Sequence, residues 1–76
     1  MKEVFVKKCW EEEDVLYYLH FIGQDAVRQI EISAGTKVLL SASDPEAFLY
    51  DQDLADLELE ESDYITRAAF DKVWAS

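Results

Sequence analysis

The first 42 residues contain four stretches with the polar and apolar pattern of β-strands. These stretches are Met1–Trp10, Val15–Ile22, Ala26–Ile32 and Thr36–Ala42. The connections between them are only three or four residues long, and they are polar or contain glycine. Such short connections join neighbouring strands as hairpins, so the pattern predicts an antiparallel meander. The run Val15–Ile22 (VLYYLHFI) is apolar on both of its faces, which indicates a central strand.

Alternation in the third stretch predicts which of its side chains share a face of the sheet. Ile30 and Ile32 are expected to face the interior together with Ala26. Gln29 and Glu31 are then expected to face outward.

After Ser43 the pattern changes and two short elements are expected. Asp44 can cap a helix and Pro45 fits its first position, so a helix of about one turn is predicted there. The segment Leu54–Glu61 (LADLELEE) has two interpretations. Its alternation of leucines with acids favours an extended edge segment, whereas its Leu, Glu and Ala content favours a helix. We prefer the extended interpretation.

The last segment predicts an amphipathic helix. Thr66 is a good N-cap, and Ile65 and Phe70 occupy the positions of a hydrophobic staple. Phe70, Val73 and Trp74 follow one another on one helical face. The sequence therefore predicts an α+β fold in a single domain, residues 1–76. An antiparallel sheet of four to five strands forms the meander, and the C-terminal amphipathic helix packs on one of its faces.

The chain has 17 acidic and 7 basic residues, which gives a net charge of −10. Such a surface is repelled by nucleic acid and by anionic membranes and is attracted to a basic protein. The alternative is that the acidity serves solubility alone. A chain of 76 residues needs most of its aromatic side chains for packing, so no deep substrate pocket is expected.

The acidic residues are concentrated in the second half of the chain. Between Lys37 and Arg67 there are nine acids and no base. If Leu54–Glu61 is extended, alternate carboxylates repeat every ~6.6–6.8 Å, which is comparable to phosphate spacing along an extended nucleic-acid strand. We therefore expect a partner-binding surface that mimics nucleic acid, with a tyrosine as its apolar anchor. The candidates are Asp51, Asp53, Asp56, Glu58, Glu60, Glu61 and Asp63, with Tyr50 and Tyr64. Either tyrosine could equally be a ring that packs over lysine stems.

The sequence offers little for catalysis, metal binding or a cofactor. Asp51-x-Asp53 begins like a calcium loop, but the later positions that such a loop requires do not follow. His20 is expected to be packed within its strand or at its rim, and Cys9 to be a small buried hydrophobe. The two could be neighbours across the first hairpin, yet no third group would orient them. No catalytic residue, metal site or cofactor is predicted, and an enzyme is not expected.

The chain has no run of about 18 apolar residues, as a membrane helix requires, and its first 14 residues lack the apolar core of a secretory signal. We therefore expect a cytoplasmic protein that does not bind membranes.

From Ala26 to Trp74 the order of features resembles a family of small acidic bacterial domains of unknown function. The resemblance rests on the strand Val27–Ile32, Gly35, an acidic loop, and the pattern Ile65-Thr66-x-x-x-Phe70-x-x-Val73-Trp74. The loop before Leu54 is shorter here than in that pattern. The resemblance implies an α+β fold. Such domains are similar in size and charge to immunity proteins that neutralise nuclease toxins and to phage, anti-CRISPR-like inhibitors of host defence nucleases.

These observations lead to one functional hypothesis with two alternatives. The chain is expected to inhibit a nuclease or similar nucleic-acid-binding complex by covering its basic surface, without catalysis and without binding nucleic acid itself. The alternatives are an acidic adaptor without inhibitory activity and a homodimer that pairs an edge strand.

Overall fold

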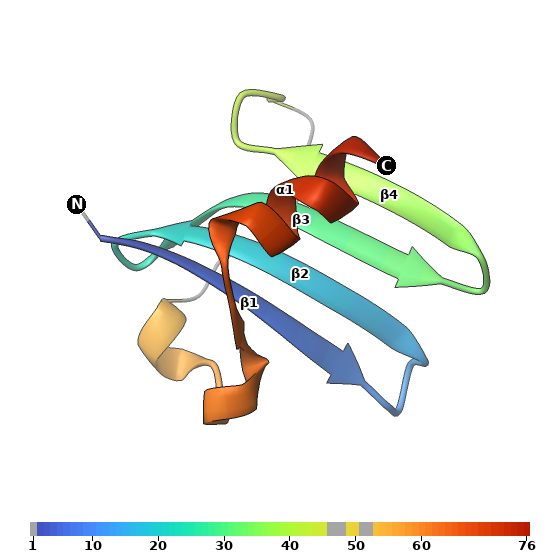
Figure 1. Cartoon of the computed structure of the whole chain (residues 1–76), viewed down its shortest axis with the longest axis horizontal. Coiled ribbons are helices and arrows are strands. Elements are labelled where there is room, and N and C mark those ends of the chain that lie inside the picture. The colour runs from blue at the N-terminus through green and yellow to red at the C-terminus, as the bar shows by residue number, and fades with distance from the viewer. Residues whose placement is uncertain (1, 46–48, 51–52) are drawn as a thin grey trace.

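The computed structural model describes residues 2–45, 49–50 and 53–76, and it contains one antiparallel sheet of five strands. The strands are β1 (Glu3–Trp10), β2 (Val15–Ile22), β3 (Asp25–Ser33), β4 (Thr36–Ser41) and β5 (Tyr64–Ile65). They lie in the order β4-β3-β2-β1-β5, with β2 in the centre (Figure 1). The predicted four-stranded meander is confirmed, and the observed strand bounds differ from the predicted ones by at most two residues.

Because β2 is apolar on both faces, the sheet has a core on each side. On one side Phe5, Ile30 and Phe70 are buried together. On the other side the buried cluster is Val6, Leu19 and Phe21. Adjacent residues of β1, Phe5 and Val6, thus point into different cores, as strand alternation requires.

The helix α1 (Arg67–Ala75) crosses the first of these faces (Figure 1). Thr66 caps it, because its Oγ1 accepts a hydrogen bond of 3.1 Å from the backbone N–H of Ala69. Ile65 packs against the same cluster as Phe70, as the predicted staple requires. The predicted helix, its cap and its buried face are confirmed.

The opposite face is partly covered by the segment that leads to β5. This segment contains two short 3₁₀ turns, η1 (Leu54–Asp56) and η2 (Glu61–Asp63). Its leucines at 54, 57 and 59 pack against the cluster of Val6, Leu19 and Phe21. The covered leucines therefore alternate with exposed acids between positions 57 and 60.

Leu54–Glu61 forms neither an edge strand nor an α-helix: it begins with the 3₁₀ turn Leu54–Asp56, and Leu57 and Glu60 after it have the predicted extended backbone without joining the sheet. The backbone N–H of Leu54 donates to the carbonyl of Gln24 at 3.2 Å, and that of Ala55 donates to Oε1 of Gln24 at 2.9 Å. The start of the segment is thus fixed to the β2–β3 turn, while the free edge of β1 pairs with β5. The short helix predicted after Asp44 lies mainly outside the described residues. Residues 42–45 form a turn in which the N–H of Asp44 donates to the carbonyl of Ser41.

The prediction that Ala26 faces the interior beside Ile30 is also wrong. Val27 has no cross-strand partner in β2, because Arg28 pairs with His20 and Ala26 with Phe21. This extra residue turns Ala26 away from Ile30 and towards the cluster that contains Phe21.

Gln29, expected to face outward, is buried, and Tyr50 lies against its side chain. Its Oε1 accepts a hydrogen bond of 2.8 Å from the backbone N–H of Tyr50. Its Nε2 donates to Glu31 at 3.2 Å, so both ends of the buried amide have partners.

Candidate protein-binding surface

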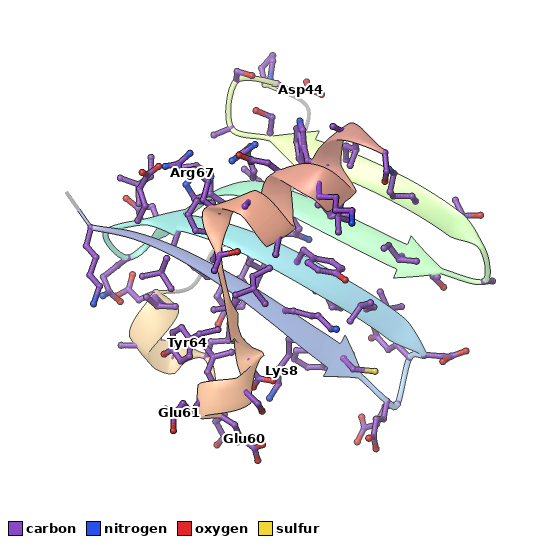
Figure 2. All side chains as sticks on the ribbon, in the orientation of Figure 1. Lys8, Asp44, Glu60, Glu61, Tyr64 and Arg67 are labelled. Atoms are coloured by element: carbon purple, nitrogen blue, oxygen red, sulfur yellow. The ribbon has the colours of Figure 1, made fainter. Side chains whose placement is uncertain are left out.

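The predicted surface lies on the segment that covers the sheet face opposite α1. Asp53, Asp56, Glu58, Glu60 and Glu61 all have exposed side chains. Glu60 and Glu61 lie at the outer end of this segment, directed away from the sheet (Figure 2). Asp51, which also belongs to the predicted surface, lies outside the described residues.

The carboxylate of Asp63 has its interaction partners within the fold. Its Oδ2 accepts a hydrogen bond of 2.9 Å from the backbone N–H of Glu60 and lies 3.6 Å from Nζ of Lys8. The same ammonium donates to the carbonyl oxygen of Glu58 at 2.7 Å. Lys8 therefore holds the acidic segment against β1, and Asp63 helps to shape the segment rather than face a partner.

The two candidate tyrosines differ in exposure. Tyr64 is 51% exposed on the edge strand β5, beside Val6 of β1. Tyr50 is half-buried, and its ring meets that of Phe21 edge-on at 6.1 Å between centroids. Tyr64 is thus the more accessible anchor, whereas Tyr50 is also a packing residue.

Acids from a second part of the chain join this surface. The β1–β2 hairpin brings Glu11 and Glu12 to the same open hollow, of about 780 Å³, that Asp56 and Glu58 line. Trp10, 43% exposed, also lines this hollow. The sequence pattern does not place these hairpin residues in the surface, because it contains no local sign that residues 10–12 and 56–58 meet. The sequence offers one signal, a run of four acids directly after a tryptophan.

The acidic block of residues 44–63 does not form one patch. Asp44 lies beyond β4, at the opposite end of the molecule from Glu60 and Glu61 (Figure 2). The carboxylates that gather are therefore those of residues 53–61 and of the hairpin.

Basic side chains compensate little of this charge. In the described part of the chain, three ion pairs within 4 Å join Lys8 to Asp63, Arg28 to Asp71 and Arg67 to Glu3. The exposed acids between positions 53 and 61 take part in none of them. Arg28 and Arg67 lie over the rings of Phe70 and Phe5, on the face that α1 covers. The side of the sheet opposite α1 is thus the more negative one.

His20 belongs to a polar network between the sheet and α1. Nε of Arg28 donates to its Nδ1 at 2.9 Å, so the ring proton is on Nε2, which lies 3.0 Å from Oε1 of Glu3. Arg67 binds the other oxygen of Glu3, and Asp71 accepts from Arg28 at 3.1 Å. Both ring nitrogens are occupied and the side chain is buried, so this histidine is a packed, neutral residue.

The pKa of His20 has a consequence for stability. Burial lowers this pKa below the usual 6.5, Arg28 and Arg67 lower it further, and Glu3 opposes the change. Between the folded and the unfolded pKa the unfolded chain binds more protons, so stability falls as pH decreases below 6.5. We expect the stability advantage of the wild type over His20→Gln to shrink between pH 7.5 and pH 5, measured by urea unfolding. An advantage that stays constant or grows would contradict this assignment.

Cys9 is exposed, not buried as predicted, because the buried cluster under α1 does not extend to the end of β1. It pairs across the hairpin with Leu16, whereas His20 pairs with Phe5, so the two are not cross-strand neighbours. Among the described residues, no three His, Cys, Asp or Glu side chains gather to hold a metal ion. No helix in the described ranges is long and apolar enough to cross a membrane.

No protein-family model, curated protein or solved structure matches this chain.

Proposed function

We propose that this chain is a non-catalytic inhibitor, of the immunity-protein or anti-defence type, that acts stoichiometrically in the cytoplasm. It binds the basic, nucleic-acid-binding surface of a nuclease or similar complex. The exposed acids of residues 53–61 and the hairpin acids meet the partner's Lys and Arg residues, and Tyr64 and Trp10 supply apolar contacts.

The supporting observation is the hollow in which Asp56 and Glu58 meet Glu11 and Glu12. Four acidic residues from two distant segments line this hollow together with the exposed Trp10, and Lys8, the one lysine among the described residues that line it, binds the backbone carbonyl of Glu58 and the carboxylate of Asp63. Like charges gathered in this way lower the stability of the free protein, so a binding role explains them better than solubility does. An exposed tryptophan is typical of an interface hot spot, and charged groups are typical of the rim around it.

The evenly spaced phosphate mimic suggested by the sequence has less support. It requires Asp56, Glu58 and Glu60 on one extended strand, and Asp56 is in a 3₁₀ turn. The proposal therefore rests on clustered carboxylates rather than on a regular repeat.

One observation favours homodimerisation as a second function. β4 is the outer strand of the sheet, and Val38 and Leu39 on it are 44% and 43% exposed. No strand among the described residues pairs with the outer edge of β4, and such a partly apolar edge of six residues can pair with the same edge of a second copy. Sedimentation between 5 and 500 μM tests this. A shift from monomer to dimer that Val38→Lys abolishes would support it.

The inhibitor proposal predicts a salt-sensitive complex with a basic protein. We expect the tagged chain to retain one nucleic-acid-binding complex from host lysate at low salt and to release it at high salt. The association rate should fall at least about tenfold between 50 and 300 mM NaCl, because long-range attraction accelerates encounter. The retained complex should then lose nucleic-acid binding in proportion to the added chain. Binding without this loss would indicate an adaptor, and the absence of a specific partner would contradict the proposal.

A further inference from the structure

A second hollow lies on the same face of the sheet, beside the acidic segment. Its volume is about 390 Å³, at the lower end of the range of about 300–1,000 Å³ in which proteins hold small ligands. Trp10, Tyr17 and Tyr50 line it together with the carboxylates of Glu13 and Glu31. It is too small for a large organic ligand but suits one side chain.

Two of the aromatic rings form adjacent walls of this hollow. The rings of Trp10 and Tyr17 are 6.1 Å apart between centroids and meet at 81°. Tyr17 is on the central strand β2 and Trp10 ends β1, so the sheet backbone fixes both positions. Two aromatic walls at right angles offer π surfaces to a cation from two directions.

The carboxylates of Glu13 and Glu31 approach Tyr17 from different parts of the chain. Glu31 is the cross-strand partner of Tyr17 in β3, and Nε2 of the buried Gln29 binds its Oε2 at 3.2 Å. Glu13 reaches from the hairpin, with its Oε2 3.5 Å from the hydroxyl of Tyr17. Burial raises the pKa of Tyr17, and the charges of Glu31 and Glu13 raise it further. The raised pKa of Tyr17 thus reflects the negative potential that both carboxylates produce at its hydroxyl.

Among the described residues, Lys8 is the one cation that lines this hollow, and it already binds the backbone carbonyl of Glu58 and the carboxylate of Asp63. An apolar occupant would remove water from Glu13 and Glu31 without replacing their hydrogen bonds, which is unfavourable. A cationic occupant would instead pair with both.

We propose that this hollow binds one arginine side chain of the basic partner, an inference that rests on the proposed function and makes it more specific. The planar guanidinium stacks on one of the two rings, Trp10 or Tyr17, and meets the other edge-on, while its N–H groups donate to Glu13 and Glu31. Arginine fits better than lysine because it is flat, is less strongly hydrated and carries five donors for two carboxylates.

The test is an NMR titration of the ¹⁵N-labelled chain with the capped tripeptide N-acetyl-Gly-Arg-Gly-amide. Saturable shifts are expected at the indole N–H of Trp10 and at Tyr17 and Glu31, with a dissociation constant on the order of millimolar. The same peptide with neutral citrulline in place of arginine should cause no shifts there. Shifts spread evenly over all exposed acids, or equal effects of the two peptides, would overturn the proposal.

Two variants with the same change of charge sharpen this test. Glu31→Gln should weaken arginine-peptide binding about fivefold or more, because it removes one paired carboxylate. Asp44→Asn removes the same charge at the other end of the molecule (Figure 2) and should change binding less than about 1.5-fold. Equal losses in both variants would mean general charge attraction and contradict a defined site.

The outcome can be separated from that of the proposed function. If the partner still binds the wild type and Glu31→Gln equally, the inhibitor proposal stands and the arginine site is wrong. If the arginine peptide binds as described but no basic partner exists in the lysate, the site stands and the inhibitor proposal is wrong.

Discussion

Replacement of Phe70 by alanine is expected to remove about 3–5 kcal/mol of stability, the usual range for a buried Phe. A chain of 76 residues has about 4–11 kcal/mol in total, so this variant should be largely unfolded in moderate urea. Phe70 is completely buried, and its ring lies 5.5 Å from that of Phe5 and 6.1 Å from that of Trp74. The guanidinium of Arg28 lies 4.7 Å from its centroid.

The large effect is expected because one side chain joins three parts of the fold. Without the ring, α1 loses its only fully buried contact with the sheet, and the polar network of Arg28 and His20 loses its apolar cover. Phe70→Leu keeps most of the volume and should cost on the order of 1 kcal/mol. Urea unfolding followed by far-ultraviolet circular dichroism measures both. A loss below about 1.5 kcal/mol for Phe70→Ala would mean that α1 is not held by this core.

The strands and α1 could be predicted because their signals are local. Alternation over Met1–Trp10 and the apolar run Val15–Ile22 each identify a strand without reference to the rest of the chain. Thr66 as a cap and Ile65 with Phe70 as a staple identify the start of α1 in the same way.

The errors concern contacts between distant segments. The bulge at Val27 cannot be seen in the sequence, because Ala26 and Val27 are both apolar and either could face the interior. Leu54–Glu61 has the alternation of a strand, but Gln24 holds its start and β5 takes the available edge. Which edge a segment pairs with is a property of the whole fold.

In the candidate surface, too, the residues with a local sequence signal could be predicted, and those that depend on contacts between distant segments could not. Asp56 and Glu58 could be chosen from the acidic run alone, and their exposure agrees with that choice. The participation of Trp10 and of the hairpin acids depends on a contact between residues more than 40 positions apart. Asp63 belongs to the same acidic run as Asp56, so the sequence does not distinguish them. In the structure Asp63 lies beside Lys8, and this contact gives it a structural role.

Replacement of three acids, Asp56→Asn with Glu58→Gln and Glu60→Gln, is expected to weaken the complex with the basic partner on the order of 30-fold. This corresponds to about 2 kcal/mol, from three interfacial charge pairs of about 0.5–1 kcal/mol each. Most of the change should be a slower association, since exposed charges act on encounter more than on dissociation. Surface plasmon resonance with the purified partner at 50 mM and 300 mM NaCl measures both rates.

The same three changes should leave the free protein as stable as the wild type or slightly more stable. All three side chains are exposed and none of them is in an ion pair within the described residues, so neutralisation mainly relieves repulsion between like charges. The matched control compares single changes of one charge, Glu58→Gln and Asp44→Asn, because Asp44 lies at the other end of the molecule (Figure 2). Only Glu58→Gln should slow association. If the triple variant binds like the wild type, these acids are not the binding surface, and if Asp44→Asn is equally slow, net charge rather than its placement drives the encounter.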